Sequence, residues 1–378
     1  MRLLIAMPTF PPVLGGIQTY GYELARRLHP RCDALTVVAP GSQGARAFDR
    51  TLPFRVHRVP AIGDDLALTG ALPIATLARL GRFETVFAGH WASAHGALRA
   101  GHSGWPKRVF CAAHGKELLH HPLRKLPLIR GGYERIRDHA LARSSGFFPV
   151  SEYTAGLLVE RGVPPSRITT VPNGVDPEAI RFGDREGIRR RLGLEDRKLL
   201  LTVARLVRRK GIDTVLEALP KIISEVPDAF YLIVGSGPDR ERIAELIQRR
   251  GLEDSVRMLG SVPGPLADYY SAADVFVMPA RTEPEDAEGF GLVFLEAGAC
   301  ERAVVGARAG GVPDAIVHGE TGLLVEPNDP AGLASALVEL LNDPVRAAAM
   351  GKRARERILA EGTWDHAAER IFEALSQG

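Results

Sequence analysis

A repeated alternation of short apolar runs and longer amphipathic segments extends along all 378 residues and constrains the fold more than any other feature. Each run is apolar at consecutive positions rather than at every second one, which indicates parallel strands covered on both faces. The amphipathic segment Ile17–Leu28 follows the first run and predicts a crossover helix. The sequence therefore predicts an α/β fold with doubly wound sheets. The first expected strands are Leu3–Met7, Ala34–Ala39, Phe54–Val59, Thr85–Ala88, Arg108–Ala113, Gly146–Val150 and Ile168–Val171.

The alternation stops in the middle of the chain and then starts again. Turn-forming residues fill Pro172–Pro177, and the charged stretch Asp184–Arg191 follows them. A chain of this length fits two domains of roughly 150–200 residues better than one core. We expect two Rossmann-like domains facing a cleft: residues 1–183, to which a last helix at 364–378 crosses back, and residues 184–363. The second set of expected elements comprises strands Leu199–Ala204, Phe230–Val234, Val256–Leu259, Val275–Met278 and Ala303–Gly306, with helices Ile212–Glu225, Arg240–Gly251, Phe290–Cys300 and 330–361.

Charge is distributed unevenly between the two halves. Residues 1–183 carry 23 Lys and Arg against 13 Asp and Glu, whereas residues 184–378 carry 25 against 32. A basic first half favours an anionic partner such as nucleic acid, a lipid surface or an acidic substrate. The segment Lys116–Arg143 combines basic residues with leucines, and it is either a surface for anionic lipid headgroups or an amphipathic helix packed on its domain. Sparse aromatic residues and the lack of a nucleic-acid-binding motif argue against RNA or DNA.

Three cysteines, Cys32, Cys111 and Cys300, show no metal-ligand spacing, so we expect neither a disulfide framework nor a metal site. The first residues resemble a short strand rather than a signal peptide. No apolar run reaches the roughly 18 residues of a membrane-spanning helix. We expect a cytoplasmic protein, with peripheral attachment to the inner face of the plasma membrane as an option.

The segment Glu288–Glu296 carries two carboxylates with seven residues between them and glycines directly after the first. If a helix starts near Phe290, Glu288 stands in the loop before it and Glu296 lies about two turns inside. Free N–H groups and the helix dipole at such a start form a phosphate site. Carboxylates on both sides of a phosphate indicate that an attached sugar is held as well. We therefore expect nucleotide-sugar chemistry.

Three further segments follow expected strands at the sheet edge where ligands bind. Gly15-Gly16 opens a helix and either approaches an anion or only makes a turn. Arg205 and Lys210 either converge on a diphosphate or belong to a solvated basic loop that includes Arg208 and Arg209. Gly235 lines a nucleotide pocket or forms a plain tight turn.

Two segments remain. His114 ends a strand in the first half, where it could bind a sugar or an acceptor, or be structural. Gly310-Gly311 precedes a short helical turn and shapes a pocket floor, with no residue-by-residue role assigned.

Together these motifs resemble the family 4 retaining glycosyltransferases of the GT-B fold, over nearly the whole chain. Within the family, the loop Thr9–Gln18 and the spacing of Arg205 and Lys210 look most like bacterial GDP-mannose-dependent mannosyltransferases of the phosphatidylinositol mannoside type. Asp314 stands where many members carry glutamate. The segments that carry the resemblance are Gly15-Gly16, His114-Gly115, Val171–Asp176, Arg205 with Lys210, Glu288 with Glu296, Gly310–Pro313 and Gly319–Val325.

The resemblance implies a role for each candidate residue. Arg205 and Lys210 would neutralise the leaving β-phosphate, and Glu296 would accept hydrogen bonds from the ribose. Glu288 would hold the transferred sugar and its developing positive charge, and His114 would contact the sugar near its 6-position or order the acceptor. The phosphate cradle would be completed by backbone N–H groups of Gly16 and of Gly289, Phe290, Gly291 and Leu292. Gly15 and Gly235 are also expected at the nucleotide-binding site.

The reaction implied is transfer with retention to a hydroxyl of a lipid-linked, small polar or other anionic acceptor, with no metal or cofactor. Sister enzymes use UDP-glucose or UDP-N-acetylglucosamine with the same motifs, so those donors stay open. A relative that epimerises or hydrolyses a nucleotide sugar is a second class, and a non-catalytic nucleotide-sugar binder is a third. A dinucleotide-dependent oxidoreductase is disfavoured because no G-x-G-x-x-G follows the first strand.

Overall fold

The computed structural model describes residues 1–60, 70–100, 104–120 and 127–377. Its contacts divide the chain into two compact units, Met1–Asn173 with Trp364–Gly378, and Gly174–Thr363. We expected the first boundary after residue 183, but Gly174–Gly183 belongs to the second unit. Two contacts explain this: Val175 N donates to Gly362 O at 3.0 Å, and Gly183 N donates to Ser271 Oγ at 2.8 Å.

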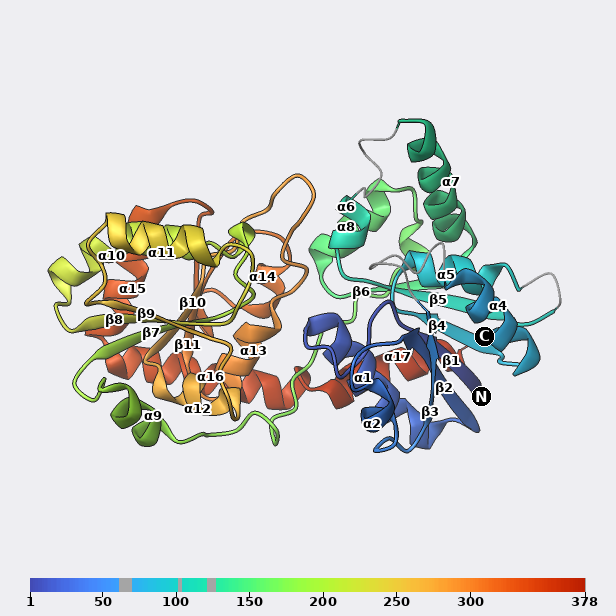
Figure 1. The fold of residues 1–378 in the computed structure, drawn as a ribbon, viewed down its shortest axis with the longest axis horizontal. Coiled ribbons are helices and arrows are strands. Elements are labelled where there is room, and N and C mark those ends of the chain that lie inside the picture. The colour runs from blue at the N-terminus through green and yellow to red at the C-terminus, as the bar shows by residue number, and fades with distance from the viewer. Residues whose placement is uncertain (61–69, 101–103, 121–126, 378) are drawn as a thin grey trace. The chain divides into compact units, whose positions relative to one another are not determined.

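The first unit is built on a six-stranded parallel sheet in the order β3-β2-β1-β4-β5-β6 (Figure 1). Its strands are β1 Arg2–Ala6, β2 Ala34–Pro40, β3 Arg55–Val59, β4 Thr85–Ala88, β5 Arg108–Ala113 and β6 Gly146–Pro149. Its helices are α1 Gly16–Leu28, α2 Ala45–Asp49, α4 Ala71–Leu80, α5 Trp91–Leu98, α6 Lys116–Leu119, α7 Pro127–Arg143, α8 Glu152–Glu160 and α17 Trp364–Ser376, with short 3-10 turns at His29–Arg31 and Pro165–Arg167.

Both faces of this sheet are covered, as continuous apolar strands require. Leu4 and Ala6 of β1 join a core cluster with α4, α5 and α7. Leu3 and Ile5 alternate with them and are also fully buried, on the face where α1 and α17 pack. The segment Ile168–Val171 was expected as a strand, which is wrong: it contributes only an isolated bridge to β6, from Ile168 to Phe147.

The second unit repeats the plan with a six-stranded parallel sheet in the order β12-β11-β10-β7-β8-β9. Its strands are β7 Lys198–Val203, β8 Ala229–Val234, β9 Val256–Gly260, β10 Val275–Met278, β11 Ala303–Ala307 and β12 Gly322–Val325. Its helices are α9 Arg185–Leu192, α10 Ile212–Glu225, α11 Arg240–Arg249, α12 Leu266–Ala272, α13 Leu292–Ala299, α14 Val312–Ala315, α15 Pro330–Asn342 and α16 Pro344–Glu361, with a 3-10 turn η4 at Arg208–Lys210.

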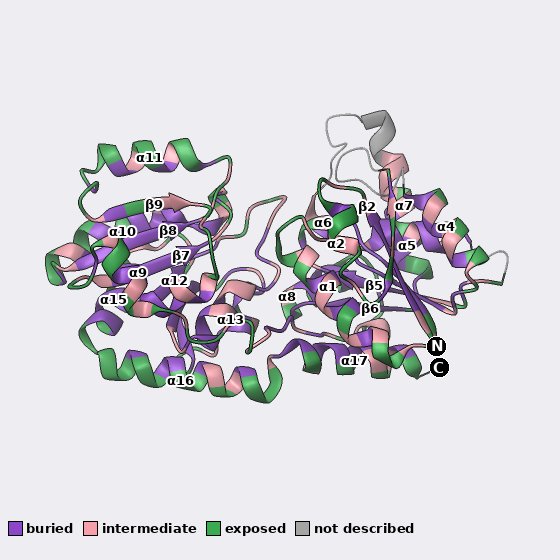
Figure 2. Cartoon of the chain, turned by 60° about the horizontal axis from the view of Figure 1, so that its bottom comes forward, coloured by how far each residue is buried: buried purple, intermediate pink, exposed green. Residues whose placement is uncertain are grey.

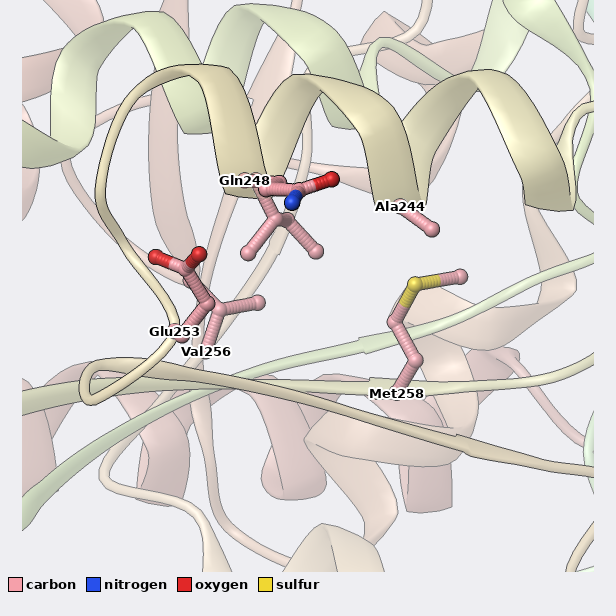
Figure 3. A pocket seen from close by; sticks show the side chains of 6 residues that line it. Ala244, Gln248, Glu253, Val256 and Met258 are labelled. Atoms are coloured by element: carbon pink, nitrogen blue, oxygen red, sulfur yellow. The ribbon is translucent and has the colours of Figure 1, made fainter.

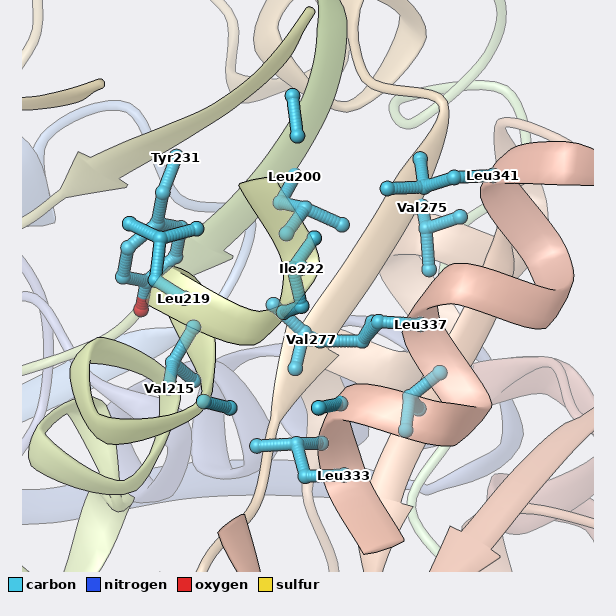
Figure 4. Packing of buried hydrophobic residues seen from close by; sticks show 14 of the residues in the cluster. Leu200, Val215, Leu219, Ile222, Tyr231, Val275, Val277, Leu333, Leu337 and Leu341 are labelled. Carbon is cyan, nitrogen blue, oxygen red and sulfur yellow. The ribbon is translucent and has the colours of Figure 1, made fainter. Parts of the chain in front are cut away.

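The core of the second unit is packed from side chains of β7, β8 and β10 against α10 and α15. Figure 4 shows Leu200, Val275 and Val277 facing the leucines of α15, with Leu219 and Ile222 of α10 beside them. Figure 2 shows the central strands such as β7 and β8 in the buried colour, while helices such as α11 and α16 present exposed outer faces. In each unit, helices pack against a six-stranded parallel sheet. This arrangement confirms the predicted α/β class with one doubly wound sheet in each unit.

Two details differ from the expected elements. The helical segment 330–361 is two helices, because Asp343 ends α15 and caps α16 by accepting from Arg346 N at 2.9 Å. The strand β12 was not among the expected strands, since its four residues give too short an apolar run to stand out.

Candidate functional site

The acidic motif lies at the carboxyl edge of the second sheet. Glu288 stands in the loop between β10 and α13, and its side chain is buried, with 9% of the residue exposed. Gly291 adopts a left-handed φ of 95°, and α13 begins at the next residue, Leu292. In the described part of the chain, no side chain caps this N-terminus. The N–H groups of the first turn are therefore available to an anion. The sequence predicted such a helix start near Phe290, two residues before the observed start at Leu292.

Two cations bind the carboxylate of Glu288. Lys210 Nζ and Arg209 Nη1 both contact Glu288 Oε2, the latter at 2.5 Å. Arg209 Nε also lies 3.0 Å from Asp286 Oδ2. Because Lys210 ends the turn after β7 and β10 pairs with β7, both partners project from the same sheet edge. The structure thus joins Lys210 and Glu288, which are 78 residues apart in sequence.

The charge state of this cluster follows from its contacts. Burial opposes ionisation of Glu288, but Lys210 and Arg209 outweigh it and hold the pKa of the carboxyl at about 2. Glu288 is therefore an anion at all pH values near neutrality. An anion fixed beside a phosphate-binding helix start is suited to stabilise a developing positive charge on a bound sugar.

Glycines 310 and 311 hold the backbone of Glu288. Gly311 N donates to Glu288 O at 2.8 Å. Gly310 has a φ of 55°, and a Cβ at this position would lie 2.3 Å from the same carbonyl oxygen. Only glycine allows this approach. The segment whose role the sequence left open therefore positions the first acidic residue.

Glu296 lies inside α13, partly exposed. Its Oε2 accepts from Tyr270 Oη at 2.5 Å. Burial raises the pKa of Glu296, and the tyrosine hydroxyl opposes that rise. Tyr270 is fully buried, so one face of this carboxylate is anchored to α12. Its role toward a ribose stays a prediction.

Arg205 and Gly235 lie at the same sheet edge but outside the cluster. The Arg205 side chain is exposed, and among the described residues it makes no ion pair with Glu288. Gly235 has a φ of 131°, and a Cβ there would lie 1.9 Å from Ala204 O. This contact favours the tight-turn interpretation of Gly235, while the donor role of Arg205 stays a prediction.

The first unit places its candidates at the carboxyl ends of β1 and β5. Gly15 has a φ of 152° and precedes α1, which starts at Gly16 with no side-chain cap. His114 follows β5, and its ring meets the edge of Tyr20 from α1, with ring centroids 4.9 Å apart. The two predicted segments are therefore neighbours in the fold, because α1 lies against the end of β5.

His114 is neutral and presents a hydrogen-bond acceptor. Burial lowers its pKa to about 4, although a hydrogen bond with the Gly89 backbone acts in the opposite direction. Nε2 is buried and has no hydrogen-bond partner among the residues that the structure describes, so the bond to Gly89 comes from Nδ1. The amide of Gly89 already donates to Ala6 O, hence Nδ1 carries the proton and Nε2 the lone pair. A sugar hydroxyl that donates to Nε2 would satisfy this atom.

We expect the His114→Ala variant to lose about tenfold in kcat/KM, the value of one hydrogen bond to a neutral group. Because the folded pKa lies below the ordinary value of 6.5, the contribution of His114 to stability is complete above pH 6.5. It declines as the pH falls from 6.5 toward 4. Melting temperatures measured over this range should fall less steeply for His114→Ala than for the wild type. A His57→Ala variant, altered at an exposed position on β3, is the control and should follow the wild type.

Sequence reasoning missed Arg209, Asp286 and Tyr270. The two arginines before Lys210 look equivalent in sequence, yet Arg208 is exposed and Arg209 is half-buried in the cluster. The difference comes from the 3-10 turn that the structure forms at Arg208–Lys210, in which residues one apart point in different directions. Nothing in the sequence marks Tyr270 as a partner of Glu296.

Part of the segment proposed for lipid binding, residues 121–126, lies outside the described residues. The described part of α7 packs on its own unit, since the Tyr133 ring meets Trp91 of α5 at 5.0 Å between centroids. No helix in the described ranges is long and apolar enough to cross a membrane. Binding to a membrane surface therefore stays a prediction.

Two hollows of the second unit lie away from this cluster. A cavity of about 410 Å³ lies between α11 and β9, lined by apolar side chains such as Val256 and Met258 (Figure 3). A second, of about 620 Å³, lies at the amino ends of the strands near Asp274 and Arg302. Neither contains a residue of the cluster around Glu288.

Two doubly wound units, with a cation-paired carboxylate before an uncapped helix in one of them, define a nucleotide-sugar transferase of the two-domain type. Comparison with known families agrees: the profile "Glycosyltransferase Family 4" matches residues 14–179 and "Glycosyl transferases group 1" matches residues 184–357. The chain therefore belongs to the family 4 glycosyltransferases.

Individual relatives indicate which members of the family this chain is similar to. The chain is 36% identical to the "GDP-mannose-dependent alpha-(1-6)-phosphatidylinositol monomannoside mannosyltransferase" of Mycobacterium tuberculosis, covering 99% of this chain and 98% of the relative. It is 32% identical to the monoacylated phosphatidylinositol monomannoside mannosyltransferase of Corynebacterium glutamicum, covering 99% and 97%. Both confirm the predicted resemblance to GDP-mannose-dependent enzymes.

Solved structures agree on the fold. The Anabaena protein HepE, crystallised with UDP, superposes with a TM-score of 0.83 at 19% identity, covering 100% of both chains. Sucrose-phosphate synthase from Thermosynechococcus elongatus superposes with a TM-score of 0.78 at 25% identity, covering 99% of this chain and 97% of that one. The predicted GT-B fold is thereby confirmed.

Proposed function

We propose that this glycosyltransferase moves mannose from GDP-mannose to a hydroxyl of a lipid-linked acceptor and forms an α-glycoside with retention. The observation that carries the proposal is the cluster of Glu288 with Lys210 and Arg209 before α13. The full-length similarity to enzymes named for GDP-mannose and phosphatidylinositol monomannoside supports the choice of substrates.

The residues take these roles in the proposed reaction. The diphosphate binds at the start of α13, where Lys210 exchanges part of its contact with Glu288 for the β-phosphate. Glu288 then faces the sugar as an anion and stabilises the positive charge that develops as the glycosidic bond breaks. Arg205, exposed at the end of β7, supplies a second cation to the leaving group.

The acceptor hydroxyl attacks from the face that the nucleotide leaves, and the departing phosphate takes its proton. Positioning and charge stabilisation then provide most of the acceleration. Because protein cations and a helix start already face the diphosphate, we propose that transfer needs no metal.

We expect calorimetric titration without added metal to give tighter binding of GDP than of UDP or ADP. The acceptor-dependent release of GDP from GDP-mannose should proceed equally in the presence of a chelator. Preference for UDP would assign the UDP-sugar alternative, and a strict need for a divalent cation would overturn the metal-free part of the proposal.

An assay of nucleotide release without acceptor distinguishes a transferase from the hydrolase or epimerase alternative. A transferase releases free nucleotide slowly without acceptor, whereas a hydrolase releases it at its full turnover rate. Retention is tested by the anomeric configuration of the product, read from its one-bond carbon–proton coupling. Sedimentation with anionic and neutral vesicles tests peripheral membrane binding of the first unit.

A further inference from the structure

Arg209 is half-buried in the cluster, with 18% of its side chain exposed, and is held from several sides. Its Nη1 donates to Glu288 Oε2 at 2.5 Å, and its Nε lies 3.0 Å from Asp286 Oδ2. Its own carbonyl accepts from Arg281 N at 2.8 Å. The neighbouring Arg208, identical in type, is exposed and lies outside the cluster. Two adjacent arginines therefore have different environments.

Lys210 has fewer carboxylate partners than Arg209. Glu288 is its ion-pair partner in the described part of the chain, and no second carboxylate anchors it. Both cations contact the same oxygen, Oε2. A lysine ammonium on a flexible stem can turn toward a phosphate at small cost, whereas a guanidinium bound to two carboxylates is pre-organised where it lies.

The loop that carries Glu288 also anchors Asp286. Glu283 N donates to Asp286 O at 2.8 Å, which closes a turn, and Gly311 N fixes Glu288 O at the other end. Arg209 thus bridges two carboxylates of one loop whose backbone is itself held. A bridge of this kind sets the side chain of Glu288, not only its backbone.

From this arrangement we propose that Arg209 is a positioning residue, which holds the Glu288 carboxylate toward Asp286 so that Lys210 is released to the donor diphosphate. This inference rests on the proposed function, in which Glu288 serves the sugar and Lys210 the phosphate. It assigns the two cations of the cluster to different tasks.

The electrostatics support this division. The charged groups that face Glu288 are Lys210 and Arg209 on the turn after β7, with Asp286 beyond Arg209. Burial opposes ionisation of Glu288, and Lys210 and Arg209 each lower its pKa, which lies at about 2. If Lys210 turned to a phosphate and Arg209 were absent, the buried carboxylate would have no counter-ion.

The test compares Arg209→Gln with Arg208→Gln as the matched control. First, the affinity of each variant for the nucleoside diphosphate that the wild type binds is measured by calorimetry. We expect both variants to stay within about twofold of the wild type, since Arg209 does not serve the phosphate, whereas Lys210→Ala weakens binding. In turnover, Arg209→Gln should lose about 100-fold in kcat from misplacement of Glu288. Arg208→Gln should be unchanged.

A pH profile separates positioning from a general loss of structure. With one cation removed, the pKa of Glu288 rises, so the acidic limb of kcat should move up by about 1–3 pH units in Arg209→Gln. Arg209→Lys keeps a charge beside Glu288 and should restore the wild-type limb while recovering only part of kcat. Asp286→Asn, which loosens Arg209, should move the limb in the same direction as Arg209→Gln.

A readout without turnover uses the melting temperature. Because the folded pKa of Glu288 lies below its unfolded value, its stabilisation is present above about pH 4.5 and is lost as the pH falls toward 2. The loss should begin at higher pH in Arg209→Gln than in Arg208→Gln.

Three results would each overturn the inference. Weakened diphosphate binding in Arg209→Gln would make Arg209 a phosphate ligand. Equal kinetics of Arg209→Gln and Arg208→Gln, or a lowered kcat of Arg209→Gln with an unmoved acidic limb, would exclude a positioning role. Failure of the wild type to transfer any sugar would instead contradict the proposed function, and the melting comparison would still test the contact.

Discussion

The Glu288→Gln variant is expected to lose about 10²–10³-fold in kcat while still binding the nucleoside diphosphate. The amide occupies the same volume but removes the negative charge, so the positive charge on the sugar loses its stabilising partner. Glu288 is the anion that the buried Lys210 and the half-buried Arg209 hold ionised, with a pKa of about 2. Steady-state transfer and calorimetric titration at pH 7 measure the two effects separately.

The control is Glu283→Gln in the same loop. Its side chain is 39% exposed, and its Oε1 lies 4.0 Å from Arg281 Nε, at the limit of an ion pair. It should transfer at the wild-type rate. Removing Glu288 also leaves two cations without a shared counter-ion, and this lowers stability by up to about 3–5 kcal/mol. Assays therefore run well below the measured melting temperature. Unchanged kcat in folded Glu288→Gln would refute its assigned role.

We expect the second large loss of activity in Gly310→Ala, although residue 310 has no assigned contact with the substrate. A Cβ at residue 310 would lie 2.3 Å from Glu288 O, and the backbone φ of 55° is itself unfavourable for alanine. The loop must move to relieve the contact, and a displacement near 1 Å at Glu288 costs about 100-fold in turnover. We therefore expect kcat to fall about 100-fold, measured in the same transfer assay.

Gly319→Ala is the matched control for this variant. Gly319 also has a positive φ, 81°, but no atom lies within 4 Å of the Cβ that alanine would add. Both variants carry the backbone strain of a positive φ, and only Gly310→Ala carries the collision. Equal activity of the two would show that the contact with Glu288 O does not position the carboxylate.

The strands and most helices of this protein could be predicted from the sequence, because the signals are local. Continuous apolar runs such as Phe230–Val234 mark parallel strands whatever the rest of the chain does. The break of 330–361 at Asp343 also has a local signal, since Asn342-Asp343-Pro344 combines a helix cap with a proline at the first position of α16. The short strand β12 depends on its neighbour β11 for definition, and four residues carry too little pattern.

The candidate site divides in the same way. Sequence alone determined the two α/β units, Glu288 with its glycine turn before a helix, Lys210, and His114 at a strand end, because each depends on the order of residues along one strand and the loop after it. Tertiary structure alone decided which of these side chains meet. Arg209 and Glu288 are 79 residues apart, and Gly311 reaches the Glu288 carbonyl only because β11 pairs with β10. Burial, too, is a property of the packed sheet edge. It separates Arg209 from Arg208 and lowers the pKa of His114, and no local pattern contains it.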